Sequence, residues 1–311
     1  MNLIFCGTPQ FAIPTLEKLI AERYVIELAV TQPDEPSGRG YEVRPPPVKE
    51  LAQRAGIPVF QPAKLKDPAT QEFLSKYHPD AIVVVAYGRI IPPWMIGLPR
   101  LGCINLHASL LPKYRGAAPI QWALIRGEQV TGVTTMKIDP GMDTGDILLM
   151  REEPIGDDDT TERLSARLST IGADLMLETL NRLNQGGITP RPQDHSQATL
   201  APMLKKEDGR IDWGMMAREI ACRIRGLRPW PGAYATFRGK NLHIWTAAVH
   251  SGEAQGLTEP GALAAEGGRL LVACGQGTQL EVKELQAEGR KRLSARDFLN
   301  GVRLAPGEKL V

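Results

Sequence analysis

Short apolar runs alternate with amphipathic stretches through the first two thirds of the chain. The runs have the composition of β-strands, and the stretches between them repeat their apolar positions with the period of a helix. This alternation predicts an α/β architecture, with a mostly parallel sheet covered by helices on both faces. The predicted strands are residues 2–6, 25–31, 81–86, 103–107 and 131–138.

One of these runs, 81–86, is apolar without any alternation, as in a strand that is buried on both sides. We therefore expect it at the centre of a Rossmann-like sheet. The first strand leads into Gly7-Thr8-Pro9, and Pro9 is well placed to open a helix. The spacing is not that of the glycine-rich dinucleotide motif, so a dinucleotide is not indicated.

The last third of the chain has a different pattern. A long amphipathic helix is predicted from Asp159 or Thr160 to the glycine pair at 186–187. An aperiodic, proline-containing stretch follows, and then one helix at 215–227 and several short strands, which suggest a small OB-like β-barrel. The predicted organisation is a catalytic domain at 1–187, a linker at 188–202 and a C-terminal domain at 203–311.

The composition shows that charge is unevenly distributed between the two parts of the chain, and it excludes few classes of protein. The 311 residues suit two domains, and the net charge of +2 divides into −3 for 1–200 and +5 for 201–311. The four cysteines are widely separated, which indicates neither disulfides nor a zinc site. With no signal-like or membrane-spanning stretch, we expect a cytoplasmic protein without membrane association. We also expect a monomer.

The segment 103–112 carries the first candidate chemistry. If 103–107 is a strand, Asn105 and His107 share one face at its carboxyl end, where open α/β sheets bind ligands. A structural interpretation stays open for such a pair: His107 would bond a backbone carbonyl, and Asn105 would cap a turn.

A second segment, 138–147, strengthens the catalytic interpretation. It follows a strand and places Asp139, Asp143 and Asp146 in one short loop. If this loop lies near the first segment, one carboxylate is close to His107. An amide, an imidazole and a carboxylate together suit addition to a carbonyl: the first two stabilise the oxyanion, and the third orients the imidazole and favours its charged form.

These residues, taken with other motifs, resemble the folate-dependent formyltransferase family over essentially the whole chain. The motifs that carry the resemblance occur in order along the sequence: Phe5-x-Gly7-Thr8-Pro9-x-Phe11, Thr31-Gln32-Pro33-Asp34, Gly38-Arg39-Gly40, Asn105-x-His107, Ser109-Leu110-Leu111-Pro112, Arg115-Gly116, Met142-Asp143-Thr144-Gly145, Lys206-Glu207-Asp208-Gly209 and Pro229-Trp230-Pro231-Gly232.

The resemblance implies a role for each matching residue. Asn105 would bind the formyl oxygen, His107 would stabilise the tetrahedral oxyanion, and Asp143 would hold His107 and assist proton transfer. Ser109, Leu110, Leu111 and Pro112 would line the folate site, and the backbone of 87–91 and 139–142 would receive the pterin. The donor would be 10-formyltetrahydrofolate, a cosubstrate, with no metal.

The resemblance also implies an acceptor, the amino group of methionine on initiator tRNA. Arg39 would contact the acceptor stem, and the second domain offers further arginines for phosphates: Arg218, Arg223, Arg225 and Arg228. Three alternatives remain at this stage: a formyltransferase for an amino sugar nucleotide, one for glycinamide ribonucleotide, and an RNA-binding protein without catalysis.

Overall fold

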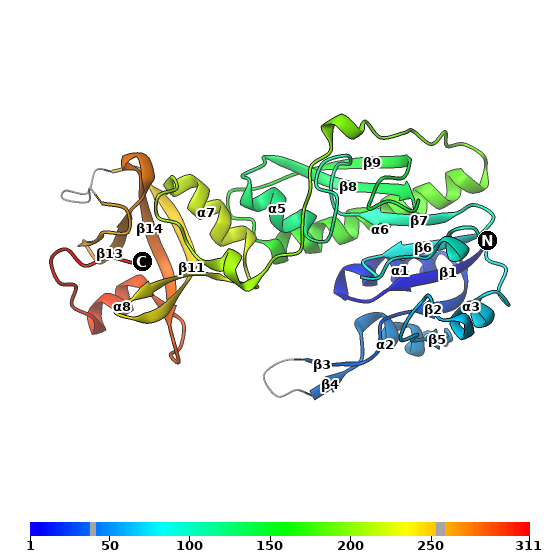
Figure 1. Cartoon of the computed structure of the whole chain (residues 1–311), viewed down its shortest axis with the longest axis horizontal. Coiled ribbons are helices and arrows are strands. Elements are labelled where there is room, and N and C mark those ends of the chain that lie inside the picture. The colour runs from blue at the N-terminus through cyan, green and yellow to red at the C-terminus, as the bar shows by residue number, and fades with distance from the viewer. Residues whose placement is uncertain (38–41, 253–258) are drawn as a thin grey trace. The chain divides into compact units, whose positions relative to one another are not determined.

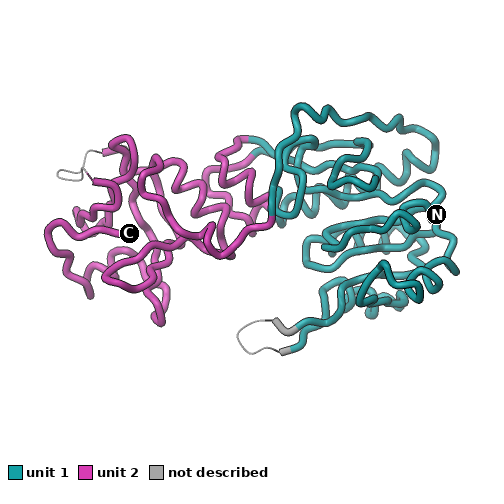
Figure 2. Tube along the Cα trace, in the orientation of Figure 1, with its two compact units in different colours: residues 1–119, 130–154, 165–202 teal, residues 120–129, 155–164, 203–311 magenta. Residues whose placement is uncertain are grey.

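The computed structural model describes residues 1–37, 42–252 and 259–311. The chain forms two compact units (Figure 2). The first contains residues 1–119, 130–154 and 165–202, and the second contains 120–129, 155–164 and 203–311. Residues 188–202, the expected linker, therefore cluster with the first unit, and two short segments from earlier in the chain cluster with the second.

A seven-stranded sheet organises the first unit (Figure 1). Its five neighbouring strands β5, β2, β1, β6 and β7 are parallel, and β8 and β9 continue the sheet antiparallel. In spatial order the strands are β5 (Val59–Phe60), β2 (Val25–Val30), β1 (Asn2–Gly7), β6 (Ala81–Val85), β7 (Cys103–His107), β8 (Val130–Lys137) and β9 (Ile147–Pro154).

The predicted fold class is confirmed, because this sheet is mostly parallel and helices accompany it. Strand β6 is fourth of seven and every residue in it is buried, as its unbroken apolar run predicted. The sequence pattern did not predict β5, which has two residues, or β9, whose second half carries three charged residues in succession. A further pair, β3 (Glu35–Ser37) and β4 (Glu42–Arg44), forms a separate antiparallel ribbon.

Each side of the parallel sheet packs against different helices. Ile4, Cys6, Ile82 and Val84 face one core, together with Leu74 and Met95 from two short helices. On the other side Leu106 of β7 packs directly on Gly172, where any side chain would collide with it. The helices of this unit are α1 (Ile13–Ala21), α2 (Pro47–Arg54), α3 (Pro68–Leu74), α4 (Pro93–Ile96) and most of α6 (Thr161–Asn184), with 3-10 turns η1 (Gln10–Ala12) and η2 (His195–Gln197).

An antiparallel sheet forms the centre of the second unit, where short strands were predicted. Its order is β10 (Ala233–Phe237), β11 (Lys240–His250), β14 (Gln279–Ala287), β13 (Arg269–Ala273) and β12 (Leu263–Glu266), with β15 (Leu293–Ser294) beside β14. The predicted helix at 215–227 is α7 (Ala217–Gly226), and α5 (Pro119–Ile125), α8 (Ala295–Gly301), η3 (Lys206–Gly209) and η4 (Gly275–Gly277) complete the elements. All four cysteines are free and buried.

Candidate active site

Strand β7 places Asn105 and His107 on the same face of the sheet. The intervening Leu106 points to the opposite face, toward Gly172 of α6. Asn105 is partly exposed, and its side-chain amide has no hydrogen-bond partner among the residues that the structure describes. A strand side chain of this kind is rigidly placed and still has its donor available for a ligand.

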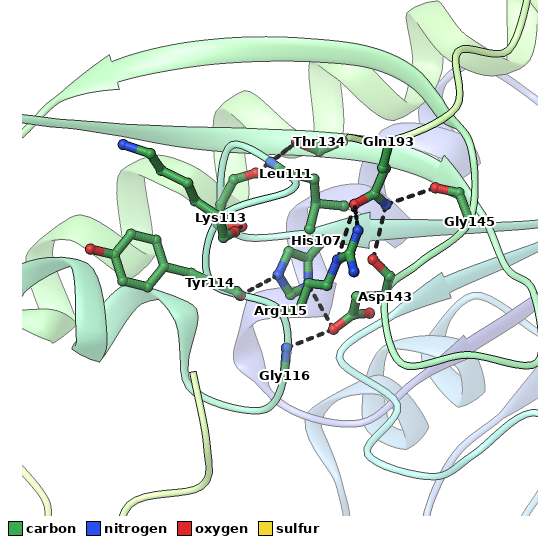
Figure 3. Close-up of polar contacts among 11 residues, drawn as sticks. His107, Leu111, Lys113, Tyr114, Arg115, Gly116, Thr134, Asp143, Gly145 and Gln193 are labelled. Carbon is green, nitrogen blue, oxygen red and sulfur yellow. Dashed lines mark hydrogen bonds and ion pairs between the residues drawn. The ribbon is translucent and has the colours of Figure 1, made fainter. Parts of the chain in front are cut away.

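The imidazole of His107 is held from both sides (Figure 3). Its Nε2 lies 2.9 Å from the carbonyl oxygen of Tyr114. A carbonyl only accepts, so this nitrogen carries the proton. Its Nδ1 lies 3.6 Å from Oδ2 of Asp143, beyond hydrogen-bond range but within ion-pair range. With 6% of its surface exposed, His107 has almost no freedom to turn away from this pair of contacts.

Asp143 occupies the tight loop between β8 and β9. Its Oδ2 also accepts the backbone N–H of Gly116 at 2.8 Å, and its own backbone has a left-handed φ of 52°. Asp139, in contrast, turns back into the loop and binds the Thr144 hydroxyl and the Gly141 N–H. The geometry therefore separates the two acids: Asp143 faces His107, and Asp139 closes the loop.

The Ser109–Leu110–Leu111–Pro112 turn links β7 to the Tyr114 carbonyl. Ser109 is fully buried, and its hydroxyl donates to the Lys113 carbonyl at 2.6 Å. Thr134 of β8 stabilises the turn by donating to the Ser109 carbonyl and accepting from the Leu111 N–H. Leu111 is buried in a small cluster with Met136 and Ile147. Of the four predicted folate residues, Leu110 and Pro112 therefore retain exposed side-chain surface.

The turn after β6 is the second region that the sequence connected with the folate. Its shape depends on the Tyr87 carbonyl, which accepts from the Thr8 hydroxyl at 3.1 Å and from Gln32 Nε2 at 2.9 Å. Gly88 has φ 78°, and a Cβ there would lie 2.5 Å from Gln32 Nε2. The neighbouring Ile90 is 79% exposed. The turn is therefore rigid in its backbone and presents an apolar side chain outward.

Sequence reasoning missed two of the residues that build this site. Tyr114 acts through its backbone carbonyl, which no side-chain pattern reveals. Gln193 lies in the aperiodic segment expected to be a linker, yet it is buried and bonds to both Arg115 and the Asp143 loop. The only signal for Arg115 was its place in the Arg115-Gly116 motif.

The predicted RNA-contacting arginines differ in their availability. Arg39 lies outside the described residues. In α7, Arg223 donates to the Asp208 carbonyl and Arg225 to the Gly156 and Asp159 carbonyls. Arg228 forms an ion pair with Glu162 at 3.3 Å. Arg218 is exposed and has no partner within the described part of the chain.

The second unit also contains a cleft of about 470 Å³ beside α7. Its charged lining residues balance one another: four arginines stand against four carboxylates. The lining residues are Asp157, Asp158, Thr160, Glu162, Arg163, Arg225, Arg228, Trp245, Thr246, Ala247, Glu284 and Arg292. Because these charges balance, the cleft does not form a strongly positive surface for a polyanion.

The described residues show neither a metal cluster nor a membrane-spanning helix. No group of three or more His, Cys, Asp or Glu side chains in 1–37, 42–252 and 259–311 has the arrangement of a metal site. Among the helices of the same ranges, none is long and apolar enough to cross a membrane.

Known proteins share both the sequence and the fold. Residues 1–180 match the formyl transferase family and residues 203–303 match the formyl transferase C-terminal domain. Among solved structures, an N-formyltransferase from Helicobacter canadensis, in complex with folinic acid and dTDP-3-aminofucose, has a TM-score of 0.70 at 17% identity, covering 92% of this chain and 98% of its own. HypX from Aquifex aeolicus, in complex with tetrahydrofolic acid, has a TM-score of 0.63 at 18% identity, covering 96% of this chain and 46% of its own. At these identities the likeness shows the fold.

Closer relatives are found by sequence. The methionyl-tRNA formyltransferase of Koribacter versatilis is 55% identical over 100% of this chain and 98% of its own length. That of Acidobacterium capsulatum is 55% identical over 100% of this chain and 99% of its own, and that of Geobacter metallireducens is 50% identical over 100% and 98%. The chain therefore belongs to the formyltransferase family and, within it, to the methionyl-tRNA formyltransferases.

Proposed function

We propose that the chain transfers the formyl group of 10-formyltetrahydrofolate to the amino group of methionine on initiator tRNA, with Asn105, His107 and Asp143 as its catalytic residues. The observation that carries this proposal is their arrangement at one end of the sheet. A free amide donor lies on the same strand face as an imidazole, and the imidazole faces a carboxylate 3.6 Å away. Family membership and the folate-bound structural neighbours support the same chemistry.

The reaction needs one charge to be stabilised and one proton to be moved. The acceptor nitrogen attacks the formyl carbon, whose oxygen becomes negatively charged, and collapse breaks the bond to the donor nitrogen. Asn105 donates a hydrogen bond from its side-chain amide to that oxygen. His107, anchored through Nε2 on the Tyr114 carbonyl, adds positive charge when both ring nitrogens are protonated. The attacking amine loses a proton as the leaving nitrogen gains one, and Asp143 accepts and returns it through water.

The folate would be held by backbone and apolar groups around these residues. The turn at 87–91 offers peptide groups whose positions are fixed by Thr8 and Gln32. The loop at 139–142 is held by Asp139, and Leu110 and Pro112 supply partly exposed apolar surface. Because 10-formyltetrahydrofolate is already an activated N-acyl donor, the proposed reaction uses no metal.

Charge and comparison support the choice of acceptor. Relatives that match the whole chain at 50–55% identity are methionyl-tRNA formyltransferases, whereas the structural neighbour in complex with dTDP-3-aminofucose is 17% identical. The net charge of +5 in 201–311 suits a polyanion such as tRNA. We infer a monomeric, cytoplasmic enzyme with a catalytic domain at 1–187 and a tRNA-binding domain at 203–311. The connecting segment at 188–202 packs with the catalytic domain. Arg39 would contact the acceptor stem.

One assay separates the candidate acceptors. Purified protein is supplied with 10-formyltetrahydrofolate and with initiator methionyl-tRNA, elongator methionyl-tRNA or a dTDP-linked amino sugar. We expect rapid turnover with the initiator tRNA alone, and a rate that falls as salt is raised. Turnover with the sugar nucleotide and none with either tRNA would replace this proposal by the sugar-nucleotide alternative.

A further inference from the structure

Gln193 connects the 188–202 segment to the loop that carries Asp143. The side chain is 6% exposed and all four of its contacts are internal (Figure 3). Its Oε1 accepts from Arg115 Nη2 at 2.6 Å and from Arg115 Nε at 3.1 Å. Its Nε2 donates to the Asp143 carbonyl at 2.9 Å and to the Gly145 carbonyl at 2.7 Å. One amide thus joins a buried guanidinium to two peptide groups of the loop.

The orientation of this amide follows from the chemistry of its partners. A guanidinium only donates and a carbonyl only accepts, so the Gln193 oxygen must face Arg115 and its nitrogen must face the loop. Arg115 is itself fixed: its side chain is 6% exposed, its Nη2 also bonds His195, and its peptide pairs with the same segment near Ala201. A flipped amide would lose all four bonds, so Arg115 sets the direction in which Gln193 donates.

The loop requires such support at Asp143. This residue has φ 52°, a left-handed conformation that residues other than glycine seldom adopt, although Asn and Asp adopt it more often than the rest. Conformations of this kind persist where the surroundings hold them. Gln193 holds the Asp143 carbonyl from one side, and the Gly116 N–H holds its carboxylate from the other. Together these two bonds determine where the carboxylate lies relative to His107.

We propose that Gln193 is a positioning residue for formyl transfer, acting through Asp143: the amide, oriented by Arg115, keeps the Asp143 carboxylate at the His107 imidazole. The inference rests on the catalytic role proposed above for Asp143. Gln193 would touch neither the formyl group nor the acceptor amine. Its proposed effect is on the position of the Asp143 carboxylate alone. A displacement of about 1 Å at a catalytic group lowers a rate by on the order of 10², so loss of the bonds to the loop should affect turnover more than binding.

Two substitutions separate donation to the loop from general packing. Gln193→Glu keeps the shape and an oxygen for Arg115, but it replaces the N–H donors with a second oxygen facing two carbonyls. Gln193→Ala removes all four bonds. Asp194→Ala is the matched control in the same segment, because its exposed carboxylate bonds to the neighbouring Ser196 and Gln197 and to neither Arg115 nor the Asp143 loop. The Glu variant keeps an oxygen that can accept from Arg115, and so it keeps the test readable where the Ala variant folds poorly.

The experiment measures kcat, KM for both substrates and the thermal midpoint of the full-length chain, using 10-formyltetrahydrofolate and initiator methionyl-tRNA. We expect kcat to fall by on the order of 10- to 10²-fold in Gln193→Glu and Gln193→Ala, with each KM within about threefold of the parent. Asp194→Ala should retain the parent kcat. A parent-like kcat in Gln193→Glu, in a protein with a parent-like thermal midpoint, would overturn the proposal.

A double-mutant cycle with Asp143→Asn identifies the route of the effect. If Gln193 acts through the carboxylate, Gln193→Glu should lower kcat little further once Asp143 is Asn. An equal fractional loss in both backgrounds would show that Gln193 acts elsewhere and would overturn the inference. The cycle also keeps the two hypotheses apart: a parent-like kcat in Asp143→Asn alone refutes the catalytic role of Asp143, whereas a slow Asp143→Asn beside a fast Gln193→Glu refutes only the positioning role.

Discussion

The Nδ1 atom of His107 lies 3.6 Å from Oδ2 of Asp143, although the two residues are 36 positions apart in the sequence. His107 is the last residue of β7, and Asp143 lies in the loop between β8 and β9. The opposite nitrogen of the same ring is bound to a backbone carbonyl, so the imidazole cannot rotate without breaking that bond. The carboxylate is likewise held by a backbone N–H. The pair is therefore preorganised by peptide groups, which suits electrostatic stabilisation of a developing charge.

This relationship predicts that two acids of one loop differ in function. Asp143→Asn keeps the shape but removes the charge opposite His107, so we expect turnover to fall by about 10² to 10⁴. Asp139→Asn leaves His107 untouched and alters only the bonds to Thr144 and Gly141, so its effect on turnover should be smaller. Steady-state rates of both variants decide the matter, and a larger loss in Asp139→Asn would show that the acid has been wrongly assigned.

A second prediction concerns Asn105, the proposed oxyanion donor. Asn105 is fixed on β7 and has no internal partner among the described residues, so its loss should leave the fold intact. We expect Asn105→Ala to lower turnover by about 10² to 10³, the usual cost of one oxyanion donor, with an unchanged thermal midpoint. His107→Ala should lower turnover comparably but also destabilise, since it leaves the Tyr114 carbonyl without that contact. Parent-like rates in either variant would remove it from the mechanism.

Much of the first unit could be predicted because its signals are local. The unbroken apolar run of β6, the alternation of Asn105 and His107 with Leu106, and the helical period before the glycine pair at 186–187 each determine one element. Asp143 could be placed in a loop from sequence, but its distance from His107 depends on β8 returning antiparallel to β7, which no local pattern specifies.

What could not be predicted depends on long-range contacts. Gln193 has no periodicity around it, and its role arises because the 188–202 segment pairs with Arg115 and with β9. The arginines of α7 read as a cationic face, yet Arg223 and Arg225 direct their guanidinium groups to backbone carbonyls. Charge in a sequence shows how many cations a region contains, but it does not show which of them remain available to a ligand.

A substitution in the turn after β6 should weaken folate binding without changing the proposed catalytic residues. At Gly88 the φ of 78° and the proximity of Gln32 both oppose a side chain. Gly88→Ala should displace the Gln32 amide from the Tyr87 carbonyl and distort the proposed pterin turn. We expect equilibrium binding of the folate to weaken by on the order of tenfold or more, the size of one lost hydrogen bond with strain. Gly56→Ala, at an open position with a similar φ, is the control for left-handed strain alone.

Asp80, which precedes β6, should make the stability of the fold depend on pH. The Asn2 backbone N–H, followed by the Arg100 guanidinium, lowers the pKa of this carboxyl below its ordinary value. A lowered folded-state pKa adds stability above the unfolded-state pKa, and that stability is lost as the pH falls through the folded value. Asp80→Asn should therefore have a lower thermal midpoint than the parent near neutral pH, with a gap that narrows below about pH 4. A gap independent of pH would refute the assignment.

The last prediction concerns the proposed binding of tRNA phosphates by α7. Arg218 is exposed and unpaired within the described ranges, whereas Arg223 on the same helix donates to the Asp208 carbonyl at 2.9 Å. Each phosphate neutralised contributes about 0.9 to the slope of log affinity against log salt in duplex DNA, and duplex RNA should behave comparably. Arg218→Gln should flatten this slope for initiator methionyl-tRNA by roughly one unit and weaken binding of elongator tRNA equally, since phosphates carry no sequence information.

Arg223→Gln removes the same charge, but it should chiefly lower the thermal midpoint and leave the slope unchanged. Equilibrium binding at four salt concentrations measures both slopes, and a flatter slope in Arg223→Gln than in Arg218→Gln would show that the hydrogen-bonded arginine is the one that meets the phosphate.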